Sequence, residues 1–223
     1  MSTKRINKAA CKRLAGEVRT ELGLDAMDAL DPWRLADLYG VPVIALGALP
    51  LDHSIRDHFH HVRPQVFSGA LLPHRTGAVI IENDAHPLAR RRSTMGHEMA
   101  HVIGEHIFGT TLVNERGCRS ADKHQEDEAA EISGELLIPF EAAKRLARQG
   151  ATDEEVALSF GVSPEMARWR MNATGARIIA QRASSFGRLL VPEIPQLGAS
   201  IHYCQLGHHR APQALRCEGL PSS

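Results

Sequence analysis

The chain has 223 residues, of which 43% are hydrophobic, 23% charged and 4% aromatic, a composition typical of a globular protein with an aliphatic core. Its 26 basic and 26 acidic residues cancel, which argues against binding to DNA or an anionic membrane through overall charge. The N-terminus lacks the apolar core of a secretory signal, no stretch has the roughly 18 apolar residues of a membrane span, and the four cysteines form no CxxC pair. We therefore expect a cytoplasmic protein that does not bind membranes and whose cysteines are reduced.

Apolar periodicity and turn residues predict several helices and a short sheet. Asp31 followed by Pro32 is typical of a helix N-terminus, because aspartate caps a helix and proline fits its first turn. The apolar triplet 79–81 favours a buried strand. The predicted helices cover residues 1–22, 32–38, 88–107, 125–137, 139–149, 153–160 and 164–174, the predicted strands cover 41–46, 67–72 and 77–82, and irregular segments cover 50–64 and the chain from 184 onward.

The segment HEMAH, residues 97–101, lies inside the predicted helix 88–107. Residues four apart on a helix share a face, so His97 and His101 can offer two imidazole nitrogens to one tetrahedral ion. Glu98 can then reach a water molecule whose pKa zinc lowers to about 7, and can remove its proton during attack on a peptide carbonyl. The segment is mostly apolar, and its polar groups are costly to bury unless they bind something. We therefore favour a metal site over a surface pair of histidines.

A catalytic zinc site usually has three protein ligands, so a third is required. The longer pattern HExxHxxGxxH does not supply it. Gly104 is in register, but Ile107 stands where the third histidine belongs and His106 comes one residue early. Glu105 is carried away from the ion by a rigid helix, and we expect it to be solvated.

The next helix offers four carboxylates as the third ligand: Glu126, Asp127, Glu128 and Glu131. Glu128 lies four residues before the apolar Ile132, which places it on the inward side of that helix. Glu126 and Asp127 have the pattern of surface charge. We therefore predict Glu128 as the third ligand.

Two longer blocks of sequence surround these residues. Residues 90–101 are RRRSTMGHEMAH and residues 128–139 are EAAEISGELLIP. They resemble RRRFTLAHELGH and EANxFAAELLMP of the ImmA/IrrE family of metallo-endopeptidases, and the similarity extends over about residues 25–175. Ala130 replaces an asparagine of the family and Met95-Gly96 replaces Leu-Ala, but neither change removes a predicted ligand or the base.

The resemblance implies an α+β, zincin-like fold of the gluzincin type, with one Zn²⁺ held by His97, His101 and Glu128. Taken together with the predicted elements, it leads us to expect a peptidase domain over residues 1–150, a small helix-turn-helix-like helical module over 151–180, and an irregular tail over 181–223. Members of the family cleave helix-turn-helix repressors, often of the Xre type, and so relieve repression of transcription during stress. An Xre-type repressor is therefore the expected substrate and partner.

A second hypothesis is a non-catalytic regulator that binds DNA or a repressor and keeps a vestigial zinc site. It rests on the helix, turn and helix predicted over 152–174, where Arg168, Arg170 and the following Arg177 could meet phosphates. We favour packing of this module against the peptidase core, because its apolar residues supply a continuous face and the net charge is zero.

Three other clusters have a plainer interpretation. Arg90, Arg91 and Arg92 are expected to form a solvated face, although one could bind an acidic partner. The histidines of residues 58–61 favour a polar loop over a metal cluster. The tail contains His202, Cys204, His208, His209 and Cys217, whose spacing is not that of a recognised zinc finger.

Overall fold

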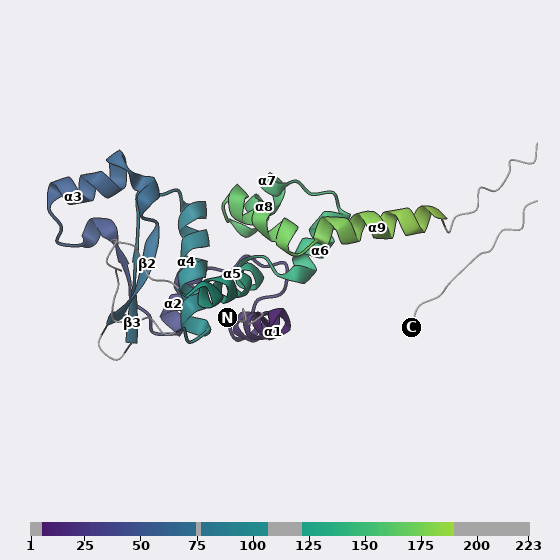
Figure 1. The fold of residues 1–223 in the computed structure, drawn as a ribbon, viewed down its shortest axis with the longest axis horizontal. Coiled ribbons are helices and arrows are strands. Elements are labelled where there is room, and N and C mark those ends of the chain that lie inside the picture. The colour runs from purple at the N-terminus through teal and green to yellow at the C-terminus, as the bar shows by residue number, and fades with distance from the viewer. Residues whose placement is uncertain (1–5, 75–76, 107–121, 190–223) are drawn as a thin grey trace, which may run out of the picture.

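The computed structural model describes residues 6–74, 77–106 and 122–189, with side chains up to residue 184. Over this part the fold is mixed α+β, with a small sheet at one end and a group of helices at the other (Figure 1). The helices are α1 (Lys8–Glu21), α2 (Pro32–Leu38), α3 (His53–Asp57), α4 (Leu88–Ile103), α5 (Lys123–Leu137), α6 (Phe140–Arg148), α7 (Asp153–Phe160), α8 (Pro164–Ala173) and α9 (Ala176–Leu189). The strands are β1 (Val43–Ala45), β2 (Gly69–His74) and β3 (Gly77–Glu82), and the short turns are η1 (Leu46–Ala48), η2 (His58–Val62) and η3 (Pro64–Val66). No helix of the described residues is both long and apolar enough to cross a membrane.

The sheet has the strand order β1-β3-β2, with β3 parallel to β1 and antiparallel to β2. Ile80 of β3 pairs with Val43 on one side and Leu71 on the other, and it is fully buried. This central place fits the apolar triplet that the sequence shows at 79–81. Strand β2 lies at the edge, so alternate backbone groups of this strand face away from the ladder.

Helix α4 lies between the sheet and the helices that follow it in the chain (Figure 1), and α5 packs against both α4 and α1. The contact between α4 and α5 is close at Gly96, where a Cβ atom would lie 2.7 Å from the Leu137 side chain. Leu137 is itself buried and has little room to move. This contact explains a glycine where the resembling family has alanine.

The basic run at the start of α4 is not the solvated face that the sequence suggests. Arg90 donates to Ser68 Oγ at 2.9 Å, and Arg91 donates to Glu82 at 2.7 and 3.1 Å. The hydrogen bond to Glu82 raises the pKa of Arg91. Arg92 donates to the carbonyl of Gly161 at 3.1 Å, in the turn between α7 and α8. The three arginines therefore fix α4 to the segment before β2, to β3 and to the later helices.

Most predicted elements have the boundaries that the sequence suggests, and three segments differ. The sequence predicts an irregular segment over residues 50–64, but the structure forms α3 and η2 there. In α3, Arg56 donates to the carbonyl of Leu49 at 3.1 Å. Helix α4 ends at Ile103 instead of near residue 107. Helix α9 continues to Leu189, past the predicted start of the irregular tail, because it packs on α6.

Helices α7 and α8 begin with strong local signals. A reciprocal capping box of Thr152 and Glu155 starts α7, and Ser163 caps α8 with Pro164 in its first turn. Gly161 between them has φ +63°, a left-handed conformation that favours glycine. These signals are local in sequence, which is why both helices have the predicted start.

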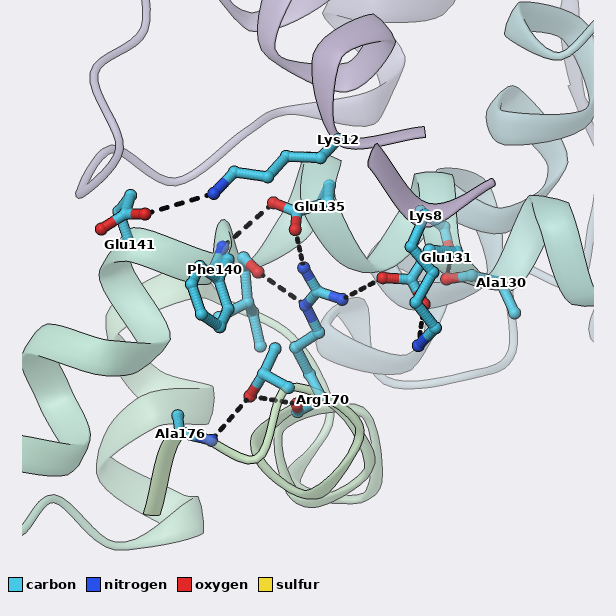
Figure 2. Close-up of polar contacts among 12 residues, drawn as sticks. Lys8, Lys12, Ala130, Glu131, Glu135, Phe140, Glu141, Arg170 and Ala176 are labelled. Carbon is cyan, nitrogen blue, oxygen red and sulfur yellow. Dashed lines mark hydrogen bonds and ion pairs between the residues drawn. The ribbon is translucent and has the colours of Figure 1, made fainter. Parts of the chain in front are cut away.

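Arg170 of α8 is fully buried and joins α8 to α5 (Figure 2). Its guanidinium lies 3.2 Å from Glu131, 2.6 Å from Glu135 and 2.9 Å from the carbonyl of Ile138. A buried guanidinium cannot contact a phosphate of DNA. The other two arginines considered above, Arg168 and Arg177, both form ion pairs with Asp153.

Candidate metal centre

Two histidines of α4 and one glutamate of α5 direct their side chains to one place. The Nε2 atoms of His97 and His101 are 3.2 Å apart, and Glu126 Oε2 lies 3.2 Å from the first and 3.6 Å from the second. Within the described ranges, this is the one group of three potential ligand residues whose atoms all lie within 4.8 Å of one another. The side chain of His101 is 1% exposed, whereas those of His97 and Glu126 are 34% and 35% exposed. The group is thus buried on one side and open to solvent on the other.

These separations fit a tetrahedral metal ion. Ligand atoms that lie about 2.0–2.2 Å from a zinc ion at tetrahedral angles are about 3.3–3.6 Å apart. The donor set of two imidazoles and one carboxylate is one that catalytic zinc sites use. Without a cation or shared protons, the same arrangement would bring the lone pairs of three acceptor atoms together. His97, His101 and Glu126 can therefore hold a metal ion.

Local structure explains why these three side chains converge. His97 and His101 lie one helical turn apart near the buried end of α4, so their rings project from one face. Helix α5 begins at Lys123, where the side chain of the N-cap residue Asp122 accepts the backbone N–H of His124 at 2.8 Å. This start places Glu126 in the first turns of α5, beside α4.

The predicted third ligand, Glu128, is not the glutamate that the structure brings to the two histidines. Its carboxylate lies 3.5 Å from His106 Nε2 and 3.8 Å from His124 Nδ1. Residues two apart on a helix differ by about 200° in direction, so Glu126 and Glu128 cannot face the same point. In the structure, the glutamate beside His97 and His101 is therefore Glu126, and the candidate ligand set is His97, His101 and Glu126.

The prediction of Glu128 treated the inward side of α5 as the side facing α4. Because α5 packs against both α1 and α4, an inward residue need not face α4. Burial raises the pKa of the Cys11 thiol on α1 and the charges of Glu128 and Glu131 raise it further, so Glu128 lies near α1 as well as near His106. The sequence has no signal that separates the two glutamates, since Glu126 lies three residues before the apolar Ala129 and Glu128 lies four residues before the apolar Ile132.

Glu98, the predicted base, is buried on α4 and points toward the edge strand. Its Oε2 accepts the backbone N–H of Leu71 in β2 at 3.0 Å. This N–H is available because Leu71 is at the sheet edge, and its partner Ile80 donates instead to Pro42 beside β1. The contact fixes the direction of the Glu98 carboxylate, next in sequence to His97.

The other candidate clusters do not form a metal centre among the residues that the structure describes. His60 of η2 pairs with Asp84 at 3.1 Å. Cys11 is a buried free thiol. The tail residues His202, Cys204, His208, His209 and Cys217 lie outside the described residues.

A cavity of about 520 Å³ opens beside His101. Its wall includes Leu71 and Pro73 of the edge strand, Tyr39 and Val102. The cavity therefore lies between the C-terminal end of α4 and the sheet, beside one of the three candidate ligands.

Comparison with known proteins gives one match. The family described as the IrrE N-terminal-like domain, Peptidase M78, matches residues 36–172, which include α4, α5, His97, Glu98, His101 and Glu126. No curated protein and no solved structure matches the chain at a significant level. The match spans more than half of the chain and contains the candidate metal centre. The chain therefore belongs to the IrrE N-terminal-like family, Peptidase M78, and is a metallopeptidase-type hydrolase.

Proposed function

We propose that this chain is a zinc endopeptidase of the zincin-like, gluzincin type, and that His97, His101 and Glu126 hold its single zinc ion. The observation that carries the proposal is the convergence of these three ligand atoms, at separations of 3.2, 3.2 and 3.6 Å, beside the helix that also carries Glu98. A set of two histidines and one glutamate leaves a coordination position for water or substrate, as catalytic zinc sites require.

Glu98 is proposed as the general base. When bound, zinc supplies a Lewis acid that polarises a peptide carbonyl and lowers the pKa of a water molecule. Glu98 accepts the proton of the attacking water and returns it to the departing amine, which is ordinary general acid–base chemistry for a carboxylate. The hydrogen bond from Leu71 orients the carboxylate for this transfer. Its burial keeps bulk water away from the proton that it holds.

An extended segment of a protein is the substrate form that fits this site. Strand β2 is an edge strand, and an edge strand can pair with an added peptide strand through backbone hydrogen bonds. The cavity beside His101 can receive one side chain of such a segment. The resemblance to the ImmA/IrrE family supports an Xre-type repressor of the cytoplasm as that substrate, with relief of repression under stress as the result.

The alternative function, a non-catalytic DNA- or repressor-binding regulator, gains little support from the arginines of residues 168–177. Arg170 is buried, and both Arg168 and Arg177 are engaged with Asp153. A protein of this kind would bind DNA in a salt-sensitive complex that survives removal of metal.

The test replaces Glu98 with glutamine in the zinc-loaded full chain. We expect the Glu98→Gln variant to bind zinc as tightly as the wild type and to cleave Xre-type repressors at least about 10²-fold more slowly, because the base is lost while the ligands remain. Cleavage is followed by mass spectrometry of the products, and zinc is measured by chelator competition.

The matched control is Asp127→Asn, which removes an exposed carboxylate on α5. This control should leave both zinc affinity and cleavage unchanged. Undiminished cleavage by Glu98→Gln would overturn the role of Glu98. A wild-type protein that binds DNA after chelation and cleaves no repressor would favour the alternative function.

A further inference from the structure

We propose that His106 and Glu128 are positioning residues for the metal ligand His101, acting in a line in which Glu128 orients His106 and His106 orients His101. The inference rests on the proposed zinc site and adds to it a function for two residues that hold no metal themselves. It also gives the predicted ligand Glu128 a different role in the same site.

The contacts form a continuous line behind His101. The Nδ1 atom of His101 lies 2.9 Å from Nδ1 of His106, and their rings are 5.0 Å apart. The side chain of His106 is 4% exposed, so both rings are shielded from water. His106 Nε2 is buried and has no hydrogen-bond partner among the described residues, and Glu128 Oε2 lies 3.5 Å from it.

The position of each proton along this line follows from the metal site. A histidine that binds metal through Nε2 is neutral and carries its hydrogen on Nδ1. His101 must therefore donate from Nδ1, and His106 must accept with its own Nδ1. A neutral His106 then carries its hydrogen on Nε2, which faces Glu128. The charge of Glu128 thus favours the tautomer of His106 that has its hydrogen on Nε2. In that tautomer His106 accepts from His101 Nδ1, which leaves the Nε2 lone pair of His101 directed at the metal.

The end of α4 is built to bring His106 back to His101. The N–H of His106 donates to the carbonyl of His101, and the N–H of Glu105 donates to that of Val102, which together form a Schellman motif. In this motif the residue two beyond the cap contacts the residue three before it. Here those two residues are His106 and His101, so the helix stop itself makes the ring contact.

Gly104 leaves the space that the ring of His106 occupies. A Cβ atom at position 104 would lie 2.7 Å from His106 Nε2 and 3.0 Å from its Cε1. Any larger residue would therefore displace the ring from its place between His101 and Glu128. The same contact thus explains both Gly104, which is in register with the longer zinc motif, and His106, which comes one residue too early for it.

The experiment measures zinc affinity of the full chain by chelator competition and the visible absorption of the cobalt(II)-substituted protein. We expect His106→Leu to weaken zinc binding by about 10–100-fold, since loss of an outer hydrogen bond to a ligand has this effect. His106→Asn should retain most of the affinity, because its Oδ1 can accept from His101 where Nδ1 did. The cobalt(II) absorption should change strongly in His106→Leu and only slightly in His106→Asn.

Glu128 is tested through a double-mutant cycle, because its charge could also act on the metal through space. Glu128→Ala alone should weaken zinc binding by about 10-fold. In the His106→Asn background the same change should have no effect, since asparagine has no group that reaches Glu128. Asp127→Asn is the control for removal of a charge from α5, and Gly104→Ala should reproduce the His106→Leu effect without removing the ring.

The outcomes separate this inference from the proposed function. Wild-type protein that binds no zinc overturns both. If the wild type binds zinc but His106→Leu and Glu128→Ala bind it equally well, only the positioning line is overturned. Equal losses in His106→Leu and His106→Asn, or a Glu128→Ala loss that persists in the His106→Asn background, overturn it as well. Complete loss of zinc from Glu128→Ala, with Glu126→Gln unaffected, would make Glu128 the ligand.

Discussion

At the scale of single residues, the backbone conformation of Glu105 positions a side chain beside the candidate metal centre. Among the described residues it is the one non-glycine residue with a positive φ, at 51°. A side chain in this left-handed conformation costs about 1–2 kcal/mol relative to glycine. The conformation turns the chain at the end of α4 so that His106 returns to His101. The strain therefore lies at the position that builds the contact behind His101, a proposed metal ligand.

Replacing Glu105 with glycine should relieve this strain. We expect Glu105→Gly to raise the free energy of unfolding by up to about 1 kcal/mol, the gain being reduced by the greater freedom of glycine in the unfolded chain. Urea denaturation of the metal-free protein measures the change. Glu105→Ala is the control, since alanine keeps the strain and should give no gain. Equal stabilisation by alanine and glycine would attribute the effect to loss of charge.

Whether the sequence could predict a site residue depends on which helix that residue comes from. His97, Glu98 and His101 belong to one helix, so their relative directions follow from helical geometry alone. The proposed third ligand comes from another helix, and its identity depends on the rotation of α5 about its axis against α4. Glu126 and Glu128 are about equally exposed, at 35% and 32%. Neither polarity nor burial could therefore choose between them.

At the scale of elements, α5 is held from several sides. It packs against α1 and α4, and its Glu131 and Glu135 contact the buried Arg170 of α8 (Figure 2). Lys8 of α1 adds a contact to Glu131 at 2.9 Å. Since α5 also carries Glu126, the orientation of this proposed metal ligand depends on contacts made by helices far from it in sequence.

Removal of the Arg170 charge should destabilise this arrangement strongly. We expect Arg170→Met to lower the free energy of unfolding by about 3–5 kcal/mol, because two nearly buried carboxylates lose their partner. Urea denaturation measures this change. Arg168→Met is the matched control on the same helix, and it should cost less than about 1 kcal/mol because the side chain of Arg168 is 60% exposed.

A second variant distinguishes charge from packing at the same place. If Glu131→Gln and Glu135→Gln are added to Arg170→Met, the loss should become smaller, since no buried charge is then left unpaired. A cost below about 1 kcal/mol for Arg170→Met alone would contradict the importance of this buried ion network.

At the scale of the whole molecule, local signals predict most elements but not their arrangement. Helices α2, α7 and α8 follow from caps, prolines and periodicity, and the β2–β3 hairpin follows from two β-rich runs. Residues 50–64 and α9 could not be predicted in this way, because their helices depend on contacts such as His60 with Asp84 and Arg177 with Asp153. The placement of α4 between the sheet and the helices that follow it in the chain (Figure 1) likewise depends on long-range packing.

The central claim is that His97, His101 and Glu126 hold a single zinc ion in this peptidase. A crystal structure of the zinc-loaded full chain, with anomalous diffraction at the zinc edge, tests it most directly. We expect one anomalous peak with the Nε2 atoms of His97 and His101 and a carboxylate oxygen of Glu126 within about 2.0–2.2 Å. Glu128 should lie beside His106 and outside this distance. A peak bound by Glu128 in place of Glu126, or no peak between the two histidines, would contradict the account.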